Sequence, residues 1–358
     1  MPGTQAIYRL WCGIDVAAKS FTVTWTLDRH TYAPAITLPQ TPDGITSLQQ
    51  LLQELEIPPR ETLIVLEATG SYWIRLAVTL HSAGYVLSVV NPTQVHHWAK
   101  SLPRRGKTDR LDAHMLSQYA YERQPRPWRP PPAVYHELRQ RLTAREGLMA
   151  MRQHARNQLH ALQQWPVQVR AALQPLEQMI VELDKQIAGL DAAIAQVLRD
   201  GAWAGSAELM QTITGIGPLT TAWVLVLTVN FQLCPTPQAA ANYAGLTPKS
   251  RESGTSVHRR AQIGHDGNVR LRTALYRATI NAARFNPLIK AFYQRLRASG
   301  KPRKVARCAA ARKLLHLLYG VVTNQRPFDP SYRSASSAHS HIAEPTPCAS
   351  CPHPVVWP

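Results

Sequence analysis

The sequence of 358 residues has only five cysteines and no long hydrophobic run. No apolar stretch approaches the roughly 18 residues that a helix needs to cross a membrane. The opening stretch MPGTQAIYRLWCGID lacks the charged and then apolar pattern of a signal peptide. We therefore expect a cytoplasmic protein without a membrane partner.

The few cysteines also argue against a zinc site built by one chain. Only Cys348 and Cys351, with His353 just after them, have the spacing of metal ligands, and no second pair exists. The surrounding segment 331–358 is rich in serine, proline and alanine. Such a composition is typical of disordered chain, and we predict a disordered tail there.

Acidic residues are nearly absent between residues 249 and 313. This stretch holds 17 lysines and arginines against two acids, Glu252 and Asp266, which supplies +15 of the chain's net charge of +18. Charge concentrated in this way is typical of a surface that binds nucleic acid. The segment also contains glycine, proline and asparagine breaks, so one long membrane-surface helix is the weaker interpretation.

The first 125 residues alternate between strand and helix patterns. Strands are predicted at residues 10–17, 21–28, 62–70 and 85–92. Thr41-Pro42-Asp43 is predicted to open a helix that continues to residue 57, and further helices are predicted at residues 72–84 and from residue 109 onward. The first two strands are close enough to pair antiparallel through Ala17–Ser20, and Thr108 can cap the last helix. The order predicts an α/β domain with a mixed sheet over residues 1–125.

Residues 126–205 are predicted to join this domain to the rest through a helical segment. Residues 125–133 are rich in proline and predict a stiff linker. Beyond it, apolar residues recur at steps of four and three, as in a coiled coil or a helical hairpin. They are Leu176, Ile180, Leu183, Ile187 and Leu190. Because Pro166 and Pro175 interrupt the pattern, two antiparallel helices and one long helix both remain open, as do oligomerisation and ordinary bundle packing.

Residues 206–330 are predicted to form a mainly α-helical domain. Its segment Gly215-Ile216-Gly217-Pro218 lies between two apolar helical stretches and has the form of a helix-hairpin-helix turn. Glycines there would leave backbone N–H groups free to hold a phosphate, although a plain turn between helices is the alternative.

Four carboxylates stand out in the first domain. Asp15 and Glu67 each end an apolar strand, where an unpaired carboxylate is costly. Asp109 and Asp112 lie three residues apart and hence on one face of a helical turn. If the strand ends and this helix converge, the four acids would need cations, and oxygen ligands suit Mg²⁺ or Mn²⁺. Two such ions could promote phosphodiester displacement. The alternatives without a metal are that Asp109 is there because the helix dipole favours an acid in the first turn, and that Asp112 is a solvated helix residue.

Ser253 lies in a Gly/Pro/Ser-rich loop that leads into a basic helix. Gly254 follows it and allows a sharp turn, and nearby arginines could hold a phosphate. No histidine base adjoins Ser253 in the sequence, although His258 and His265 are candidates. From the residues alone, a serine that merely contacts phosphate is the better interpretation. The full set expected to bind nucleic acid is Arg104, Arg105, Lys107, Gly215, Gly217, Lys249, Arg251, Arg259, Arg260, Arg270 and Arg272.

Two sets of motifs together resemble one class of insertion-sequence transposases. The set Gly13-Ile14-Asp15, Glu67-Ala68-Thr69-Gly70, Lys107-Thr108-Asp109 and Asp112-Ala113 is similar to the RuvC-like DEDD domain of that family, which has an RNase H-like fold. The set Ala244–Pro248, Ser253-Gly254, Ile263-Gly264, Gly267-Asn268 and Leu271-Arg272 is similar to its C-terminal transposase domain. The resemblance spans roughly residues 10–325.

The resemblance implies a recombinase that exchanges strands between donor and target DNA, guided by a structured bridge RNA. Asp15, Glu67, Asp109 and Asp112 would bind Mg²⁺, and Ser253 would form a covalent phosphoserine. The active form would be a tetramer, a dimer of dimers, in the bacterial cytoplasm and on the nucleoid when bound to DNA. This chain has Arg-Glu-Ser-Gly where many relatives have a second serine before the nucleophile, so Ser250 and Ser256 remain alternatives.

Two other functions fit the same residues. A metal-dependent nuclease that cleaves DNA junctions would use the carboxylates and leave Ser253 to bind phosphate. A non-catalytic scaffold for DNA or RNA would need neither. A covalent protein–DNA adduct separates the recombinase from the nuclease, since hydrolysis by water leaves none.

Overall fold

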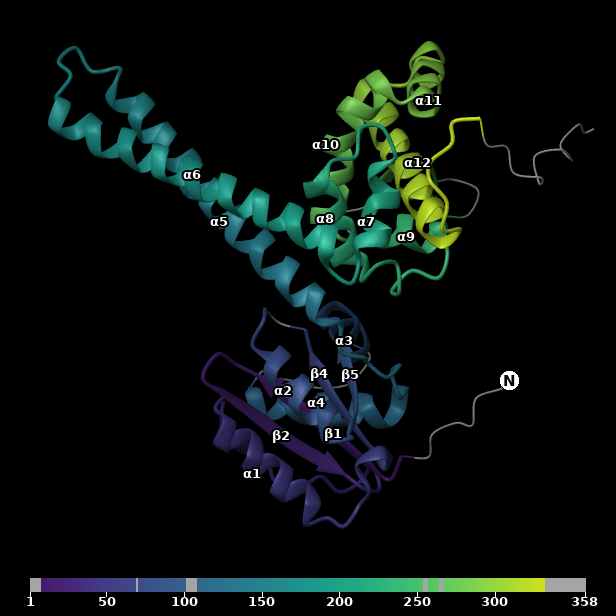
Figure 1. The fold of residues 1–358 in the computed structure, drawn as a ribbon. Helices are drawn as coiled ribbons and strands as arrows, with labels where there is room; N and C mark the ends of the chain where they lie inside the picture. The colour runs from purple at the N-terminus through teal and green to yellow at the C-terminus, as the bar shows by residue number, and fades with distance from the viewer. Residues whose placement is uncertain (1–7, 69, 101–107, 254–256, 264–266, 332–358) are drawn as a thin grey trace, which may run out of the picture. The chain divides into compact units, whose positions relative to one another are not determined.

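The computed structural model describes residues 8–68, 70–100, 108–253, 257–263 and 267–331 (Figure 1). The chain divides into two compact units, Met1–Pro131 and Pro132–Pro358. Within the described residues, no helix is both long and apolar enough to cross a membrane.

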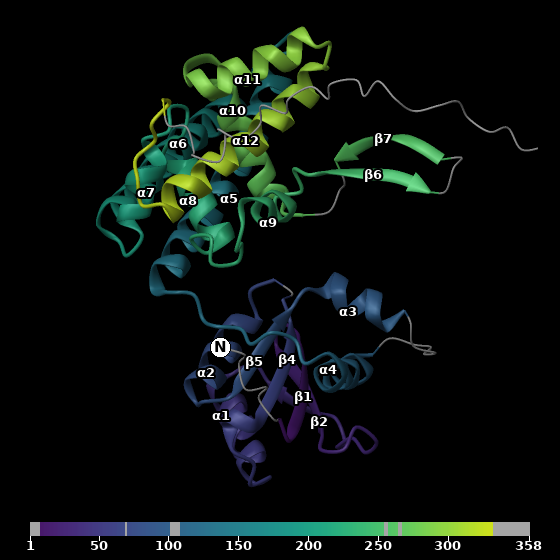
Figure 2. The ribbon, with the colours of Figure 1, turned by 90° about the vertical axis from the view of Figure 1, so that its right-hand side faces the viewer.

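The first unit is built on a mixed sheet of five strands (Figures 1 and 2). In chain order the strands are β1 (Leu10–Val16), β2 (Ser20–Thr26), β3 (Ile36–Pro39), β4 (Thr62–Glu67) and β5 (Val86–Val90). Their spatial order is β3-β2-β1-β4-β5. β1, β4 and β5 run parallel, while β2 pairs antiparallel with both β1 and β3. The predicted mixed α/β sheet is confirmed, including the turn between the first two strands.

Helices cover both faces of this sheet. α1 (Pro42–Gln53) and α2 (Trp73–Ser82) pack on the face that holds Leu10, Cys12 and Ile14. The opposite face is covered by α3 (Pro92–Ala99) and α4 (Asp109–Arg123). Alternate residues of a strand point to opposite faces, so β1 contributes Trp11, Gly13 and Asp15 to the side of α3 and α4.

Two elements of the first unit were missed in the sequence. β3 lies at the sheet edge and has only four residues, so its alternation of Ile36 and Leu38 with exposed residues is too short to predict a strand. α3 directly follows β5, and its start is marked by the Asn91 cap and Pro92 at the first helical position. This capping signal was present, but the helix is only eight residues long.

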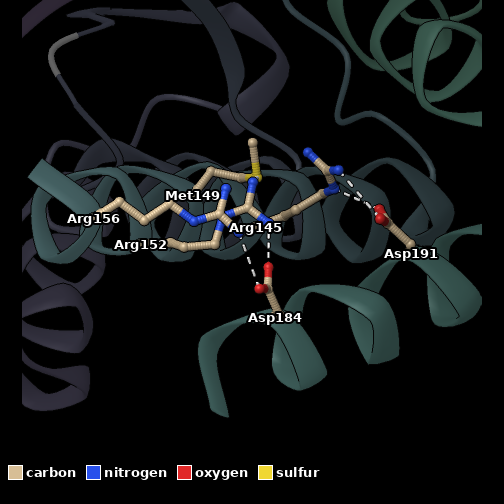
Figure 3. A network of polar contacts seen from close by, with 6 residues as sticks. All are labelled: Arg145, Met149, Arg152, Arg156, Asp184 and Asp191. Atoms are coloured by element: carbon tan, nitrogen blue, oxygen red, sulfur yellow. Dashed lines mark hydrogen bonds and ion pairs between the residues drawn. The ribbon is translucent and has the colours of Figure 1, made fainter. Parts of the chain in front are cut away.

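The second unit begins with two long helices, α5 (Ala133–Leu162) and α6 (Arg170–Asp200). Arg145 binds Asp191, and Arg152 and Arg156 both bind Asp184 (Figure 3). Because higher numbers on α5 pair with lower numbers on α6, the helices are antiparallel. The helical hairpin is thus the correct alternative to a single helix. Each of the five predicted seam residues from Leu176 to Leu190 is buried or half-buried.

Acid should weaken this hairpin through Asp184. Hydrogen bonding from Arg152, then the charges of Arg152 and Arg156, lowers the carboxyl pKa below its ordinary value of 3.8. Because the pKa is lower in the folded state, the ionised carboxylate stabilises the fold at any pH above the pKa of the unfolded state. This contribution is lost as the pH falls through the pKa of the folded state. We expect Asp184→Asn to lower the free energy of unfolding at neutral pH, with the difference from wild type shrinking in acid.

Urea titrations across this pH range measure the effect, and Glu182→Gln on the same helix is the control. Glu182 accepts a hydrogen bond from Gln186 and has no arginine partner among the described residues. An equal effect of the two substitutions at every pH would contradict the assignment.

The remaining helices pack around the base of this hairpin. They are α7 (Ala204–Gln211), α8 (Pro218–Thr228), α9 (Pro237–Tyr243), α10 (Val269–Phe285), α11 (Pro287–Ala298) and α12 (Arg303–Thr323). Their common core includes Leu138 of α5, Val197 of α6, Leu225 of α8 and Leu314 of α12. The mainly α-helical character of this part of the chain agrees with the prediction.

The segment around Ser253 was predicted as a loop but contains a two-stranded antiparallel ribbon (Figure 2). Its strands are β6 (Pro248–Ser253) and β7 (Val257–Ile263), with a register shift between Lys249 and Arg251. The loop prediction was therefore wrong in its backbone, although the basic helix α10 does follow.

Candidate active site

Gly13 lets helix α4 approach strand β1 unusually closely. A Cβ atom at this position would lie 2.2 Å from both the Ala113 carbonyl oxygen and the Ser117 backbone nitrogen. Real Cβ contacts are not that short, so only glycine fits. Nearby, the buried Ser117 hydroxyl donates a hydrogen bond of 2.8 Å to the Trp11 carbonyl oxygen. These contacts fix both the distance and the register of α4 on β1.

Asp15 and Glu67 lie side by side at the ends of neighbouring parallel strands. Ile14 of β1 is in register with Leu66 of β4, and each carboxylate is the next residue. By strand alternation both belong to the face covered by α4. Both residues are half-buried, in contrast to the fully buried Ile14 and Leu66 just before them.

The first turn of α4 reaches the same end of β1. The helix runs opposite to β1. Going forward along β1 from Trp11 to Gly13, the contacts move back along α4 from Ser117 toward Ala113. Two residues of strand span about as far as four residues of helix. Counting back along α4, Asp15 therefore lies level with the turn that holds Asp109 and Asp112.

The two aspartates of this turn differ in exposure. Asp112 is half-buried, while Asp109 is exposed. Asp112 lies four residues before the buried Leu116, on the helix face toward the sheet. Thr108 caps the helix as predicted, with its hydroxyl accepting a hydrogen bond of 3.3 Å from the Leu111 backbone N–H. The fold thus brings Asp15, Glu67 and Asp112 to one corner, with Asp109 at its outer edge.

This corner does not by itself form a closed metal centre. Over the ranges that the structure describes, no three His, Cys, Asp or Glu side chains gather closely enough to hold a metal ion. The donor set nevertheless has the right chemistry, because hard carboxylate oxygens are the ligands that Mg²⁺ takes in proteins. The assignment of these four residues as metal ligands stays a prediction.

Replacing Gly13 by alanine should destabilise the first unit. The added methyl group would force α4 away from β1, and overpacking of this kind costs about 3 kcal/mol. Thermal unfolding followed by circular dichroism measures the loss. Gly147→Ala in helix α5 is the control, because a Cβ there meets nothing within 4 Å and alanine favours helix. Equal melting temperatures for wild type and Gly13→Ala would contradict the close packing.

Ser253 is the last residue of β6, directly opposite Val257 of β7. Arg251, two residues earlier, is opposite Arg259. The cross-strand pair of arginine positions is thus two residues from Ser253, and Glu252 and His258 form the pair between them. The turn residues 254–256 lie outside the described residues, and with them Ser256.

The base of this ribbon is held by two glycines. A Cβ at Gly267, where φ is +90°, would lie 2.6 Å from the Gly245 backbone nitrogen. The Asn268 backbone N–H donates a hydrogen bond of 2.7 Å to the Tyr243 carbonyl oxygen, and its side chain caps α10. Three residues of the transposase-like motif, Gly245, Gly267 and Asn268, therefore have a structural role, because they join α9 to α10 beneath the ribbon.

The other residues expected to bind nucleic acid have diverse settings. Arg270 lies over the Trp223 ring, 5.5 Å from its centroid, and binds Glu146 of α5 at 3.0 Å. Arg272 donates a hydrogen bond of 3.4 Å to the Ala244 carbonyl oxygen. Lys249 and Arg260 lie in β6 and β7. The three predicted cations Arg104, Arg105 and Lys107 lie outside the described residues.

The two turn glycines before α8 are not equivalent. Gly215 has φ +100°, and a Cβ there would lie 2.7 Å from the Ala282 backbone of α10. Gly215 therefore allows the turn before α8 to pack closely against α10. Gly217 precedes Pro218 at the start of α8, and a Cβ there would meet nothing within 4 Å. The space needed for a phosphate is thus present at Gly217 rather than at Gly215.

Sequence reasoning did not find the contacts that hold α4 from its other side. The Tyr32 ring lies 3.8 Å from the His114 ring, centroid to centroid, and the Arg29 guanidinium carbon lies 5.7 Å from the Tyr121 centroid. Tyr32 and Arg29 both come from the connection between β2 and β3, which has no local sequence signal for such a contact.

Two family models match this chain, one after the other. Residues 12–164 match a family model described as "Transposase", of the DEDD type of the IS110 group. Residues 207–294 match a second model, "Transposase IS116/IS110/IS902 family".

Three individual proteins are also similar. The "pilin gene-inverting protein" of Moraxella lacunata and that of Moraxella bovis are each 31% identical to this chain over 330 residues, which covers 90% of this chain and 98% of the relative. An uncharacterized 43.6 kDa protein of insertion element IS110 from Streptomyces coelicolor is 30% identical over 114 residues, 32% of this chain and 28% of that protein.

The two family matches and the similarity to the pilin gene-inverting proteins define the class: a transposase or recombinase, an enzyme that processes DNA. The chain belongs to the DEDD-type insertion-sequence transposase family, the family that its motifs resemble.

Proposed function

We propose that this protein cleaves and rejoins donor and target DNA through a Mg²⁺-dependent carboxylate site and a covalent phosphoserine at Ser253. The observation that carries the proposal is the packing of α4 against Gly13. It brings the turn of Asp112 level with Asp15, beside Glu67, on one face of the sheet. Mn²⁺ could replace Mg²⁺ at such oxygen ligands.

The carboxylates would hold the ions and set their position. Asp15, Glu67 and Asp112 are half-buried and therefore suited to fixed ligation, while the exposed Asp109 can adjust to the DNA. Bound Mg²⁺ would supply charge stabilisation for the attacking and leaving oxygens of the phosphodiester. The chain's own acids hold the scissile phosphate in place only through these ions, because bare carboxylates repel it.

Ser253 would act as the nucleophile. Its hydroxyl oxygen bonds to phosphorus and loses its proton, and the bond from phosphorus to the departing deoxyribose oxygen breaks, so that a strand end with a free hydroxyl is released. The phosphoserine retains the phosphodiester energy, and a hydroxyl from the second DNA then displaces serine. Arg251 and Arg259, paired two residues from Ser253, would offset phosphate charge during both steps.

The partners proposed here follow the family. We propose a structured bridge RNA that pairs with donor and target DNA, and a tetramer, a dimer of dimers, as the active form. The net charge of +15 between residues 249 and 313 suits contact with both nucleic acids. The proposed functional division is a RuvC-like domain at 1–125, a helical segment at 126–205, a transposase domain at 206–330 and a tail at 331–358.

The relatives named for pilin gene inversion support a recombinase. Inversion requires that cut strands be rejoined to new partners, which a hydrolytic nuclease does not do. The test is a strand-joining assay with donor DNA, target DNA and the RNA flanking the element. Joined products that need Mg²⁺ and disappear with Asp15→Ala support the proposal. Cleaved but unjoined DNA would indicate a nuclease. DNA binding without any cleavage, unaffected by Asp15→Ala, would indicate a scaffold.

A further inference from the structure

A hollow of about 680 Å³ lies beside helix α12, at the root of the ribbon that carries Ser253. Leu246, Pro248 and Ile263 form the wall on the ribbon side, and Phe292 of α11 contributes an aromatic side chain. The volume is within the range of pockets that bind small organic groups. The proposed cleavage and joining chemistry uses none of these lining residues.

Helix α12 presents a buried apolar face and a second stripe that is half apolar and half polar. One buries Ala306, Ala310, Leu314 and Leu318 in the core. The other lines the hollow with Val305, Ala309, Arg312 and His316, which are spaced by four, three and four residues and so form one stripe. Val305 is 52% exposed. The buried face already packs the helix into the core, so the stripe along the hollow is free to contact a ligand.

The edges of the hollow are positively charged. Lys304, Arg312 and Lys313 line it, and of the described residues around it none is acidic. The Lys313 ammonium lies 4.8 Å from the Phe292 ring centroid, and the Arg295 guanidinium carbon lies 5.3 Å from the same centroid. Burial and the charge of Arg295 lower the pKa of Lys313. Like charges gathered without a carboxylate favour an anionic ligand.

His316, one of the residues that line the hollow, contains a buried polar atom. The Nε2 atom of His316 is buried and has no hydrogen-bond partner among the described residues. Burial and the nearby Arg312 charge lower the pKa of His316, which favours the neutral imidazole. His316 therefore adds no positive charge to that of Lys304, Arg312 and Lys313.

We propose that this hollow binds one unpaired nucleotide of the DNA substrate, with the base between Val305, Ala309 and Phe292 and the adjoining phosphates on Lys304, Arg312 and Lys313. Apolar walls with cations at the edge are the usual means of holding a single strand, since every base has an apolar face and every linkage a charge. This inference rests on the proposed action on DNA and adds a strand-anchoring site to it.

The position of the hollow gives the bound nucleotide a role in guiding the strand. β6 begins at Pro248 in the wall and ends at Ser253, five residues and about 17 Å further along the strand. A base held at the root would thus fix how the DNA strand runs toward the serine. Because β6 connects this hollow to Ser253, whose proposed substrate is DNA, DNA rather than RNA is the ligand assigned.

The chain's own residues 332–358 are the rival occupant. They include the apolar run Val355-Val356-Trp357, which could enter an apolar hollow. Their charged side chains, however, are one arginine and one glutamate, so they bring no net negative charge to the cations. Charge complementarity therefore favours the nucleotide.

The test uses the full chain and single-stranded DNA oligonucleotides in which each base in turn is removed. For wild type we expect one abasic position to weaken binding about tenfold, as for the loss of one stacked base. Ala309→Phe should fill the hollow, bind the intact oligonucleotide about tenfold more weakly, and become insensitive to that abasic position. The control is Ala291→Phe, an exposed position of α11 outside the hollow. Melting temperatures confirm that both variants fold.

Three results would overturn the proposal. One is equal binding by Ala309→Phe and Ala291→Phe. Another is base dependence with RNA oligonucleotides only. The third is tighter, base-dependent binding after truncation beyond Ser331 with no effect of Ala309→Phe, which would assign the hollow to the tail. Ser253→Ala separates this inference from the proposed chemistry, because it should keep base-dependent binding even if the covalent step fails.

Discussion

Asp15→Asn is expected to reduce DNA cleavage about a thousandfold or more, with DNA binding retained. Asparagine keeps the size of the side chain but removes the charge that would hold Mg²⁺ at the end of β1. Metal ions contribute several kcal/mol to the stabilisation of the transition state, and each 1.36 kcal/mol is a factor of ten in rate. Single-turnover cleavage of labelled donor DNA measures the loss.

Asp112→Asn should behave like Asp15→Asn, because the Gly13 contact brings the turn of Asp112 level with Asp15. Asp109→Asn should cost less, since Asp109 is exposed at the outer edge of the corner. The matched control is Asp43→Asn, an exposed aspartate in the first turn of α1 on the opposite side of the sheet. Unchanged cleavage by Asp15→Asn would remove the carboxylate site from the mechanism.

Ser253→Ala is expected to abolish DNA joining, to below about one ten-thousandth of the wild-type rate, because no other group would form the covalent intermediate. The alanine retains the strand backbone of β6, so binding should persist. Ser250→Ala and Ser256→Ala are the controls, as the two alternative nucleophiles. Wild-type joining by Ser253→Ala, with loss in either control, would reassign the nucleophile.

Most of the α/β unit could be predicted from sequence, because the strands and helices that bury one face in the core show this as a regular spacing of apolar residues. The apolar alternation of β2 and the capping residues Thr41 and Thr108 are local signals, and both helices begin where these residues predict. The order of the elements then limits the possible sheets. The edge strand β3 and the short helix α3 lacked comparable apolar signals and were missed.

The carboxylate corner was predictable in composition but not in geometry. Asp15 and Glu67 could be recognised as charged residues at the ends of apolar strands. That α4 lies over them depends on Gly13, whose importance is visible only from the 2.2 Å approach of the Ala113 and Ser117 backbone. In a strand, glycine alone usually indicates a bulge or close approach without showing to what.

The serine ribbon escaped prediction for a physical reason. Sequence periodicity detects a strand through the burial of one face, and the strands PKSRES and VHRRAQI contain little apolar alternation. A charged two-stranded ribbon therefore has the composition of a loop. The long α5–α6 hairpin was ambiguous for another reason, since its apolar seam suits several partners. The ion pairs of Arg145 with Asp191 and of Arg152 and Arg156 with Asp184 show the antiparallel arrangement.

The most direct test of the central claim is a covalent-adduct assay. Purified protein, the element-flanking RNA and a donor–target DNA pair would be incubated with Mg²⁺ and separated on denaturing gels, beside Ser253→Ala and Asp112→Ala. We expect a protein–DNA adduct with wild type and none with either variant, because the serine and the carboxylates would act in one reaction. Cleavage without an adduct that persists in Ser253→Ala would contradict it and make the protein a metal-dependent nuclease.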